Sequence, residues 1–234
     1  MLIKYTGIIV SSKVYKENDL LIKFLSDTDQ LISGIVYGGM SKKKKNIFQL
    51  GFFLDLEVNY RNNRPPSILG ELKEPYISSI INDKYKMSCL LSIITLLNLS
   101  VIEGQKNDKL FQISSEFIKT MIIKKSWLVF YFKYKFNFLK IIGYEIDYNR
   151  KYKYEYFDLD TLDFTKNKSV SSIYFPYNLF ETNNVKKFNL NTIQNFFKIF
   201  ETILLRNHLS NVNLQLPNQY VLFKKLILDF YLLR

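Results

Sequence analysis

Four consecutive lysines, Lys42 to Lys45, form the most concentrated charge in the sequence. Glycines stand on both sides, at Gly38-Gly39 and at Gly51, and give this segment backbone freedom at its ends. Ammonium groups on such a loop act as mobile point charges that suit contacts with phosphate. A solvated surface run without a ligand is the alternative. We expect phosphate contact, extended by basic residues near the ends of predicted strands: Lys13, Lys16, Arg61 and Arg64.

The whole chain is basic, with 33 Lys and Arg against 21 Asp and Glu and a formal net charge of +12. Residues 1–82 hold 11 basic and 8 acidic residues, and the remainder holds 22 and 13. A field of this sign favours polyanionic partners, either nucleic acid or an anionic membrane surface. Three tyrosines near the basic residues are candidate platforms for base stacking, although core or rim packing is the commoner role: Tyr15, Tyr37 and Tyr60.

Signals for enzymatic chemistry are poor. His208 is the only histidine, Cys89 is the only cysteine, and the glycines do not fit a phosphate-cradling GxxxxGK[ST] loop. The run Asp158, Asp160 and Asp163 lacks the central glycine and terminal glutamate of a calcium loop, so we expect a solvated loop there. The sequence therefore predicts a protein that is not an enzyme, with no cofactor and no metal site.

The N-terminus has no signal peptide pattern, and the longest apolar runs, such as Cys89 to Leu97, are too short to span a bilayer. A single cysteine fits a reducing compartment. We expect a soluble cytoplasmic protein with no membrane partner.

The first 75 residues predict five short strands. The clearest is the fourth, because Leu54, Leu56, Val58 and Tyr60 alternate with polar residues. The others are expected at residues 6–15, 20–25, 31–37 and 67–73, with residues 61–66 as a turn that breaks the pattern. Five short strands in this length are typical of a small closed barrel of the OB type.

After residue 75 the pattern becomes helical. Five helices are expected, of which the first covers residues 80–102 and the last runs from Pro217 to residue 233. The three between them are expected to be capped by Asp108, Ser126 and Asn191 and to end at residues 123, 142 and 207 respectively. Gly143 is expected to end the third helix. Residues 144–188 read as irregular with a few short strands. The fold class is therefore α+β, with an OB-fold domain at 1–78 and a helical domain at 79–234.

The order of several segments resembles the RecO family of bacterial DNA repair and recombination mediators. The matching stretches are Gly7 to Val10, Tyr15 to Leu20, Gly34 to Gly39, Ser41 to Lys43, Leu50 to Phe53, Glu71-Leu72, Glu74-Pro75 and Phe138 to Tyr144. Many members bind zinc through four cysteines after the last of these stretches. This sequence has none there, so the resemblance implies a member without zinc whose insert at 149–188 is held by packing alone.

The resemblance implies an OB barrel followed by a helical domain, in a nucleoid-associated protein that binds single- and double-stranded DNA. It implies annealing of complementary strands and loading of recombinase onto strands coated by single-strand-binding protein. The implied partners are RecR, in many bacteria RecF, and the acidic C-terminal tail of the single-strand-binding protein. We expect that tail to bind the basic helical half, at Arg206, Lys224 and Lys225.

Two other functions suit the same composition. An RNA-binding or ribosome-associated OB protein would have the same charge and barrel. A structural adaptor would use its helical half and carry charge only for solubility. Oligomeric state, stoichiometry with RecR and the barrel face that meets DNA are left open by the sequence.

Overall fold

A closed five-stranded barrel forms the N-terminal part of the computed structural model, which describes residues 1–74, 76–148, 154–181, 188–210 and 213–233. Its strands are β1 (Leu2–Tyr15), β2 (Asp19–Ser26), β3 (Leu31–Val36), β4 (Phe53–Arg61) and β5 (Arg64–Glu74), in the order β1-β2-β3-β5-β4. A bulge between Ile9 and Ser11 bends β1, whose first half pairs with β4 and whose second half pairs with β2. The predicted OB-like barrel is confirmed.

The lysine run was expected in a loop, and this expectation is wrong. Residues Lys42–Ile47 form a short helix, α1. Lysine is a good helix former. Phe48, which directly follows α1, is buried in the barrel core and anchors the end of the helix there. Gly70 leaves the space that the Phe48 ring occupies, since a Cβ there would lie 3.2 Å from it.

The predicted breaker at residues 61–66 is also shorter than expected. Only Asn62 and Asn63 form the turn, and β5 already begins at Arg64. Pro65 and Pro66 lie where the β4–β5 register shifts between Asn59 and Arg61. Proline lacks an N–H, and a bulge is one of the places where a strand tolerates this.

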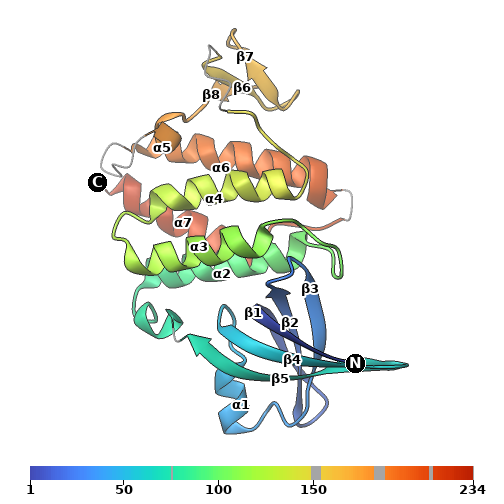
Figure 1. The fold of residues 1–234 in the computed structure, drawn as a ribbon. Helices are drawn as coiled ribbons and strands as arrows, with labels where there is room; N and C mark the ends of the chain where they lie inside the picture. The colour runs from blue at the N-terminus through green and yellow to red at the C-terminus, as the bar shows by residue number, and fades with distance from the viewer. Residues whose placement is uncertain (75, 149–153, 182–187, 211–212, 234) are drawn as a thin grey trace.

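Helices cover one end of the barrel and build the second half of the molecule (Figure 1). A 3-10 turn at Tyr76–Ser79 leads into α2 (Lys84–Ser100), α3 (Leu110–Ile123) and α4 (Leu128–Ile141). A small sheet of order β7-β6-β8 follows, from Tyr156–Asp158, Asp163–Thr165 and Ser172–Tyr174, and then the short α5 (Asn178–Glu181). The chain ends with α6 (Leu190–Leu204), a π-helical turn at Leu205–Leu209 and α7 (Asn218–Leu232).

The helix starts differ from the predicted ones because other residues cap them. Asp83 caps α2 by accepting from the Tyr85 and Lys86 amides, and Asn189 rather than Asn191 caps α6. The start of α4 at Leu128 has no side-chain cap, so Ser126 does not play that role.

The predicted Asp108 cap of α3 is wrong as well. Its place is taken by Asp29 of the β2–β3 turn, whose two carboxylate oxygens accept from the Lys109 and Phe111 amides.

One core joins the two halves. A cluster of buried residues unites Ile8, Val10, Leu25, Leu31 and Phe53 of the barrel with the helices, while a second cluster fills the barrel interior. The division into domains at residue 78 stays a prediction. None of the helices in the described parts of the chain is long and apolar enough to cross a membrane.

Closure of the barrel depends on Gly34. Strands β3 and β5 pair at Ile35 and Ser67, and a Cβ on Gly34 would lie 2.7 Å from the Pro66 carbonyl oxygen. We expect Gly34→Ala to lower the free energy of unfolding by about 1–3 kcal/mol, because β3 and β5 must separate. Urea denaturation measures this, with Ser33→Ala as the neighbouring control. Equal stability of the two variants would contradict the close approach.

Candidate nucleic-acid interface

A row of polar side chains crosses three strands of the barrel. The register places Ser11 of β1 opposite Lys23 of β2, and Lys23 opposite Ser33 of β3. These residues line a groove of about 400 Å³ together with Lys13, Leu21, Ile22, Asn98 and Glu103. Hydroxyl, amide and ammonium donors in one groove suit the oxygens of a phosphodiester.

The charge of this groove is partly compensated. The Lys23 ammonium lies 3.3 Å from a carboxylate oxygen of Glu103, and its side chain is 26% exposed. Lys13 is exposed and makes no hydrogen bond or ion pair with the described residues. Lys13 is therefore the groove's uncompensated cation.

Arg61 and Arg64 lie at the tip of the β4–β5 hairpin, which projects beyond the barrel (Figure 1). Both residues and the two asparagines between them are exposed. Pro66, two residues beyond Arg64, closely approaches Gly34 of β3. The hairpin therefore adjoins β3, the strand that carries Ser33 at one end of the polar row.

The lysines of α1 form a second basic group. Lys42, Lys43 and Lys45 are exposed, whereas Lys44 is half-buried and its ammonium donates to the Tyr37 carbonyl oxygen at 2.6 Å. The β1–β2 turn, which carries Lys16, is tied to the segment just before α1. In that contact the Met40 amide donates to the Asn18 carbonyl at 3.0 Å, and the Gly38 amide donates to the Asp19 carboxylate at 2.8 Å.

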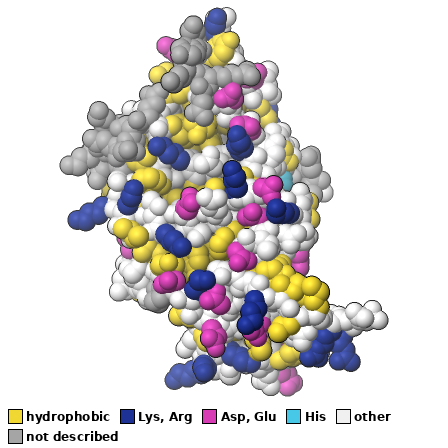
Figure 2. Space-filling model, in the orientation of Figure 1, with side chains coloured by type: hydrophobic (Ala, Val, Ile, Leu, Met, Phe, Trp, Pro, Cys, Tyr) yellow, Lys and Arg dark blue, Asp and Glu magenta, His cyan; other side chains and the backbone are white. Residues whose placement is uncertain are grey.

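The structure therefore places Lys16 and the α1 lysines at one end of the barrel, while Arg61 and Arg64 lie on a separate hairpin. Figure 2 shows that Lys and Arg side chains are also spread over the helical half, with acidic side chains between them. The assignment of all these residues to a nucleic-acid interface stays a prediction.

The three candidate stacking tyrosines differ in access. Tyr37 is 53% exposed. Tyr15 is half-buried, with the Lys16 ammonium 5.4 Å from the centre of its ring. Tyr60 is half-buried and its hydroxyl lies 3.3 Å from that of Tyr5, and burial raises the pKa of Tyr60 above its usual value. Tyr37 is the most accessible of the three for stacking.

Two of the three residues considered for the partner tail are engaged within the molecule. Arg206 donates to the carbonyls of Leu159 and Asp160 and pairs with the Asp160 carboxylate at 3.1 Å, which fastens the small sheet to the end of α6. The Lys224 ammonium lies 2.7 Å from Glu201. Lys225 is exposed on α7. Tail binding by these residues stays a prediction.

The acidic run has a structural role at its first residue. The Asp158 carboxylate accepts from the Ser169 and Ser171 hydroxyls and from the amides of Asp160 and Thr161. The hydrogen bond from Ser171, followed by those from Thr161 and Ser169, lowers the pKa of Asp158 well below its usual range. No group of three potential metal ligands occurs among the described residues.

His208 lies beside an aromatic residue. The Tyr144 hydroxyl donates to the Asn207 carbonyl at 2.9 Å and lies 3.3 Å from Nδ1 of His208. Both residues are half-buried, in line with a packing role for this histidine.

Reasoning from the sequence missed the groove residues Ser11, Lys23, Ser33 and Asn98. A local signal existed for Lys23, because it alternates with the apolar Ile22 and Phe24 of a predicted strand. Its partners follow only from the strand register, and Asn98 comes from α2.

Comparison with known proteins shows which family this barrel resembles. Residues 1–74 match the family model described as Recombination protein O N terminal. The chain is 30% identical over 151 residues to the DNA repair protein RecO of Rickettsia canadensis, which covers 64% of this chain and 62% of the relative. It is 30% identical over 148 residues to that of Rickettsia akari, covering 63% and 62%. Against that of Hyphomonas neptunium it is 22% identical over 144 residues, covering 60% and 59%. The chain thus matches less than two thirds of the length of these relatives.

Proposed function

We propose that the chain is a member of the RecO family and that it acts in DNA repair and recombination as a DNA-binding mediator. In this role it binds single- and double-stranded DNA and anneals complementary strands. It also helps to load a recombinase onto strands coated by single-strand-binding protein. We propose that it does this without catalysis and without a cofactor.

The observation that carries the proposal is the polar row Ser11–Lys23–Ser33 on the β1–β2–β3 face, beside basic residues at both ends. OB barrels commonly bind single strands along this part of the sheet, with help from the loops that follow β1 and β4. Here the β1–β2 turn carries Lys16 and the β4–β5 hairpin carries Arg61 and Arg64. We therefore propose that the DNA backbone follows this face rather than the β4–β5 side.

Annealing by such a surface follows from charge. Two complementary strands repel each other through their phosphates, and a cationic surface that binds both lowers this repulsion and raises their local concentration. The net charge of +12 is spread over both halves of the chain, so two strands have room to bind at once. No covalent bond changes, and no acid or base is required.

The proposed partners are RecR, RecF and the acidic tail of the single-strand-binding protein. The excess of 22 basic over 13 acidic residues after residue 82 supports a site for an acidic tail on the helical half. Since Arg206 and Lys224 already pair with carboxylates within the molecule, Lys225 is the one of the three that forms no ion pair with the described residues.

Replacing Lys42, Lys43 and Lys45 with alanine is expected to weaken single-strand binding and make it less dependent on salt. Each lost phosphate contact lowers the magnitude of the slope of log K against log salt by about 0.7, so three contacts give about 2. Titration of a labelled oligonucleotide by fluorescence anisotropy at several salt concentrations measures the slope. Lys133→Ala, on the helical half, is the control. An unchanged slope in the triple variant removes α1 from the interface.

The RNA-binding alternative has a direct test. Matched DNA and RNA oligonucleotides of one sequence should compete for the protein, because the 2′-hydroxyl is what distinguishes them at a binding site. We expect DNA to bind at least as tightly as RNA. A clear preference for RNA would favour the alternative.

A further inference from the structure

Helix α7 turns a largely apolar face toward solvent. Leu222 is 57% exposed and Leu232 is 67% exposed, while Val221 and Leu233 beside them are exposed as well. With 3.6 residues per turn, these four side chains lie on one side of the helix. The helix packs on α2 and α6, and its opposite side carries the buried residues: Tyr220, Phe223, Ile227 and Tyr231. Within the described part of the chain nothing covers the exposed face, and an apolar surface of this kind is typical of a contact between proteins.

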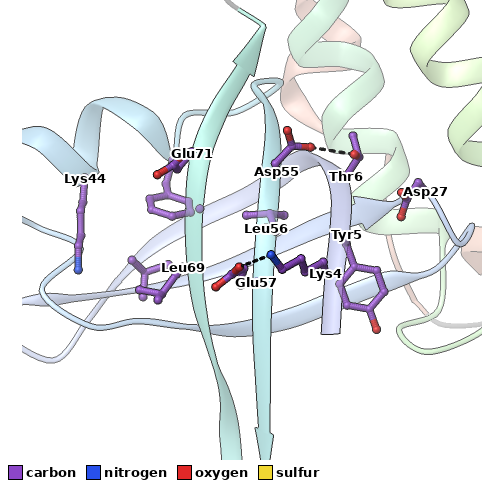
Figure 3. A pocket seen from close by; sticks show the side chains of 13 residues that line it. Lys4, Tyr5, Thr6, Asp27, Lys44, Asp55, Leu56, Glu57, Leu69 and Glu71 are labelled. Atoms are coloured by element: carbon purple, nitrogen blue, oxygen red, sulfur yellow. Dashed lines mark hydrogen bonds and ion pairs between the residues drawn. The ribbon is translucent and has the colours of Figure 1, made fainter. Parts of the chain in front are cut away.

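Two opposite charges lie in the middle of this face. Lys225 and Asp229 are exposed and form no ion pair with each other or with other described residues. Their spacing along the helix allows an ion pair, but lysine before the acidic residue is the less favourable order. On the barrel, by contrast, Lys4 and Glu57 lie opposite each other on β1 and β4 and do pair at 3.0 Å (Figure 3). The face on α7 is therefore neutral in a chain of net charge +12, and it offers phosphate no net attraction.

The exposed face of α7 is complementary to a second copy of itself. In the sequence, Lys225 and Asp229 are each two positions from Ile227, and Leu222 and Leu232 are each five positions from it. When two copies pack their α7 helices antiparallel about a twofold axis at the level of Ile227, residues at equal distances from it face each other. Lys225 of each copy then meets Asp229 of the other, and Leu222 meets Leu232. A parallel pair of helices would instead place like charges together.

We propose that α7 is the interface between two copies of this chain, which pack antiparallel across a twofold axis. Two ion pairs between Lys225 and Asp229 fix the register, and the leucines on either side supply apolar contact. One pair of helices buries less than about 1,200 Å² in total, so the dimer is weak and reversible. Dimerisation does not depend on the proposed DNA binding. Because Lys225 is also the residue proposed for the acidic tail, the tail and the second copy exclude each other at this face.

Sedimentation equilibrium of the full chain tests the proposal at about 0.15 M salt, where repulsion between two basic copies is screened beyond about 8 Å. We expect the wild type to form dimers at concentrations on the order of 100 µM. Lys225→Glu and Asp229→Lys each bring like charges together twice across the axis, so each is expected to weaken dimerisation by about tenfold or more. An equimolar mixture of the two variants is expected to recover the wild-type affinity, because every carboxylate of one copy then faces a lysine of the other.

Lys168→Glu is the matched control. It makes the same charge change between β7 and β8, at the end of the molecule farthest from the barrel (Figure 1), and is expected to leave dimerisation unaltered. Recovery in the mixture also shows that both α7 variants are folded. The proposal is overturned if the wild type remains monomeric throughout this range of concentration, or if the mixture fails to recover dimerisation. Dimers that both α7 substitutions leave intact, or that Lys168→Glu weakens as much as Lys225→Glu, would overturn it as well.

Discussion

Replacing Lys135 with methionine is expected to stabilise the protein at pH 7 by about 1–3 kcal/mol, although it removes a charge from the centre of the helical half. A buried cation costs desolvation that its partners often fail to repay, and well-packed apolar replacements of similar volume are frequently more stable. Methionine keeps the length of the lysine stem and deletes only the amine. The midpoint of thermal unfolding measures the change.

The surroundings of Lys135 explain the direction of this effect. Its side chain on α4 is 1% exposed, and its nitrogen lies 4.8 Å from the ring centre of Phe200, 5.1 Å from that of Tyr220 and 5.3 Å from that of Tyr131. Burial lowers the pKa of Lys135 to about 7, while Cys89 and Glu201 act in the opposite direction. Aromatic faces attract the ammonium, but no hydrogen bond from it to the described residues is present.

The lowered pKa of Lys135 makes the free energy of unfolding depend on pH. The folded-state pKa of about 7 lies below the ordinary value of 10.5, so between these values the unfolded chain binds a proton that the folded chain lacks. The contribution of Lys135 to the free energy of unfolding therefore rises as pH increases from 7 to 10.5, by about 1.4 kcal/mol per pH unit. Lys135→Met should remove this rise.

Urea denaturation of the wild type and the variant at several pH values between 7 and 10 measures this difference. Lys133→Met on the same helix is the control, because Lys133 is partly exposed and its replacement should change stability by no more than about 0.5 kcal/mol. A Lys135→Met variant that is less stable than the wild type at pH 7 would contradict the prediction.

Replacing Asp29 with alanine is expected to lower the free energy of unfolding by about 1–3 kcal/mol. The Asp29 carboxylate, which belongs to the barrel, accepts hydrogen bonds from the backbone amides of Lys109 and Phe111, each at 2.9 Å. It thus provides partners for two amides at the start of α3 that have none within the helix. The backbone of Asp29 also has φ +64°, which aspartate and asparagine tolerate better than alanine. Its loss affects both the helix cap and the contact between barrel and helices.

Asp108→Ala is the matched control for this prediction. Asp108 stands two residues before the start of α3, but its side chain is 79% exposed and pairs only with Lys106. Exposed ion pairs contribute little, so we expect a change within about 0.5 kcal/mol. Chemical denaturation of both variants decides which carboxylate caps the helix. A larger loss in Asp108→Ala than in Asp29→Ala would contradict the structure.

The barrel was predictable because its signal is local. The alternation from Leu54 to Tyr60 reports a half-buried strand within one segment, and β4 extends it by only one residue at either end. The order of strands with its glycines and turns then restricted the fold to a small barrel. The helix end at Gly143 was predictable for the same reason, since φ +95° at that residue favours glycine.

The parts that were not predictable depend on contacts distant in sequence. Asp29 caps a helix 80 residues away, and no local pattern prefers it to Asp108. The helix propensity of Lys42 to Lys45 was not enough to predict α1, because so short a helix also depends on the burial of Phe48 in the barrel. Lys224 was considered for an external partner, but Glu201 on α6 pairs with it. Candidate site residues chosen by charge alone miss such internal partners.

Annealing of complementary DNA strands precoated with single-strand-binding protein is the measurement that decides whether the chain is a recombination mediator. Energy transfer between dyes on the two strands follows the reaction in the absence of any nucleotide. We predict that the full chain accelerates annealing of both bare and coated strands, and that the Lys42, Lys43 and Lys45 alanine variant is slower at raised salt. No acceleration of either kind of strand by the folded wild-type chain at low salt would contradict the proposed function.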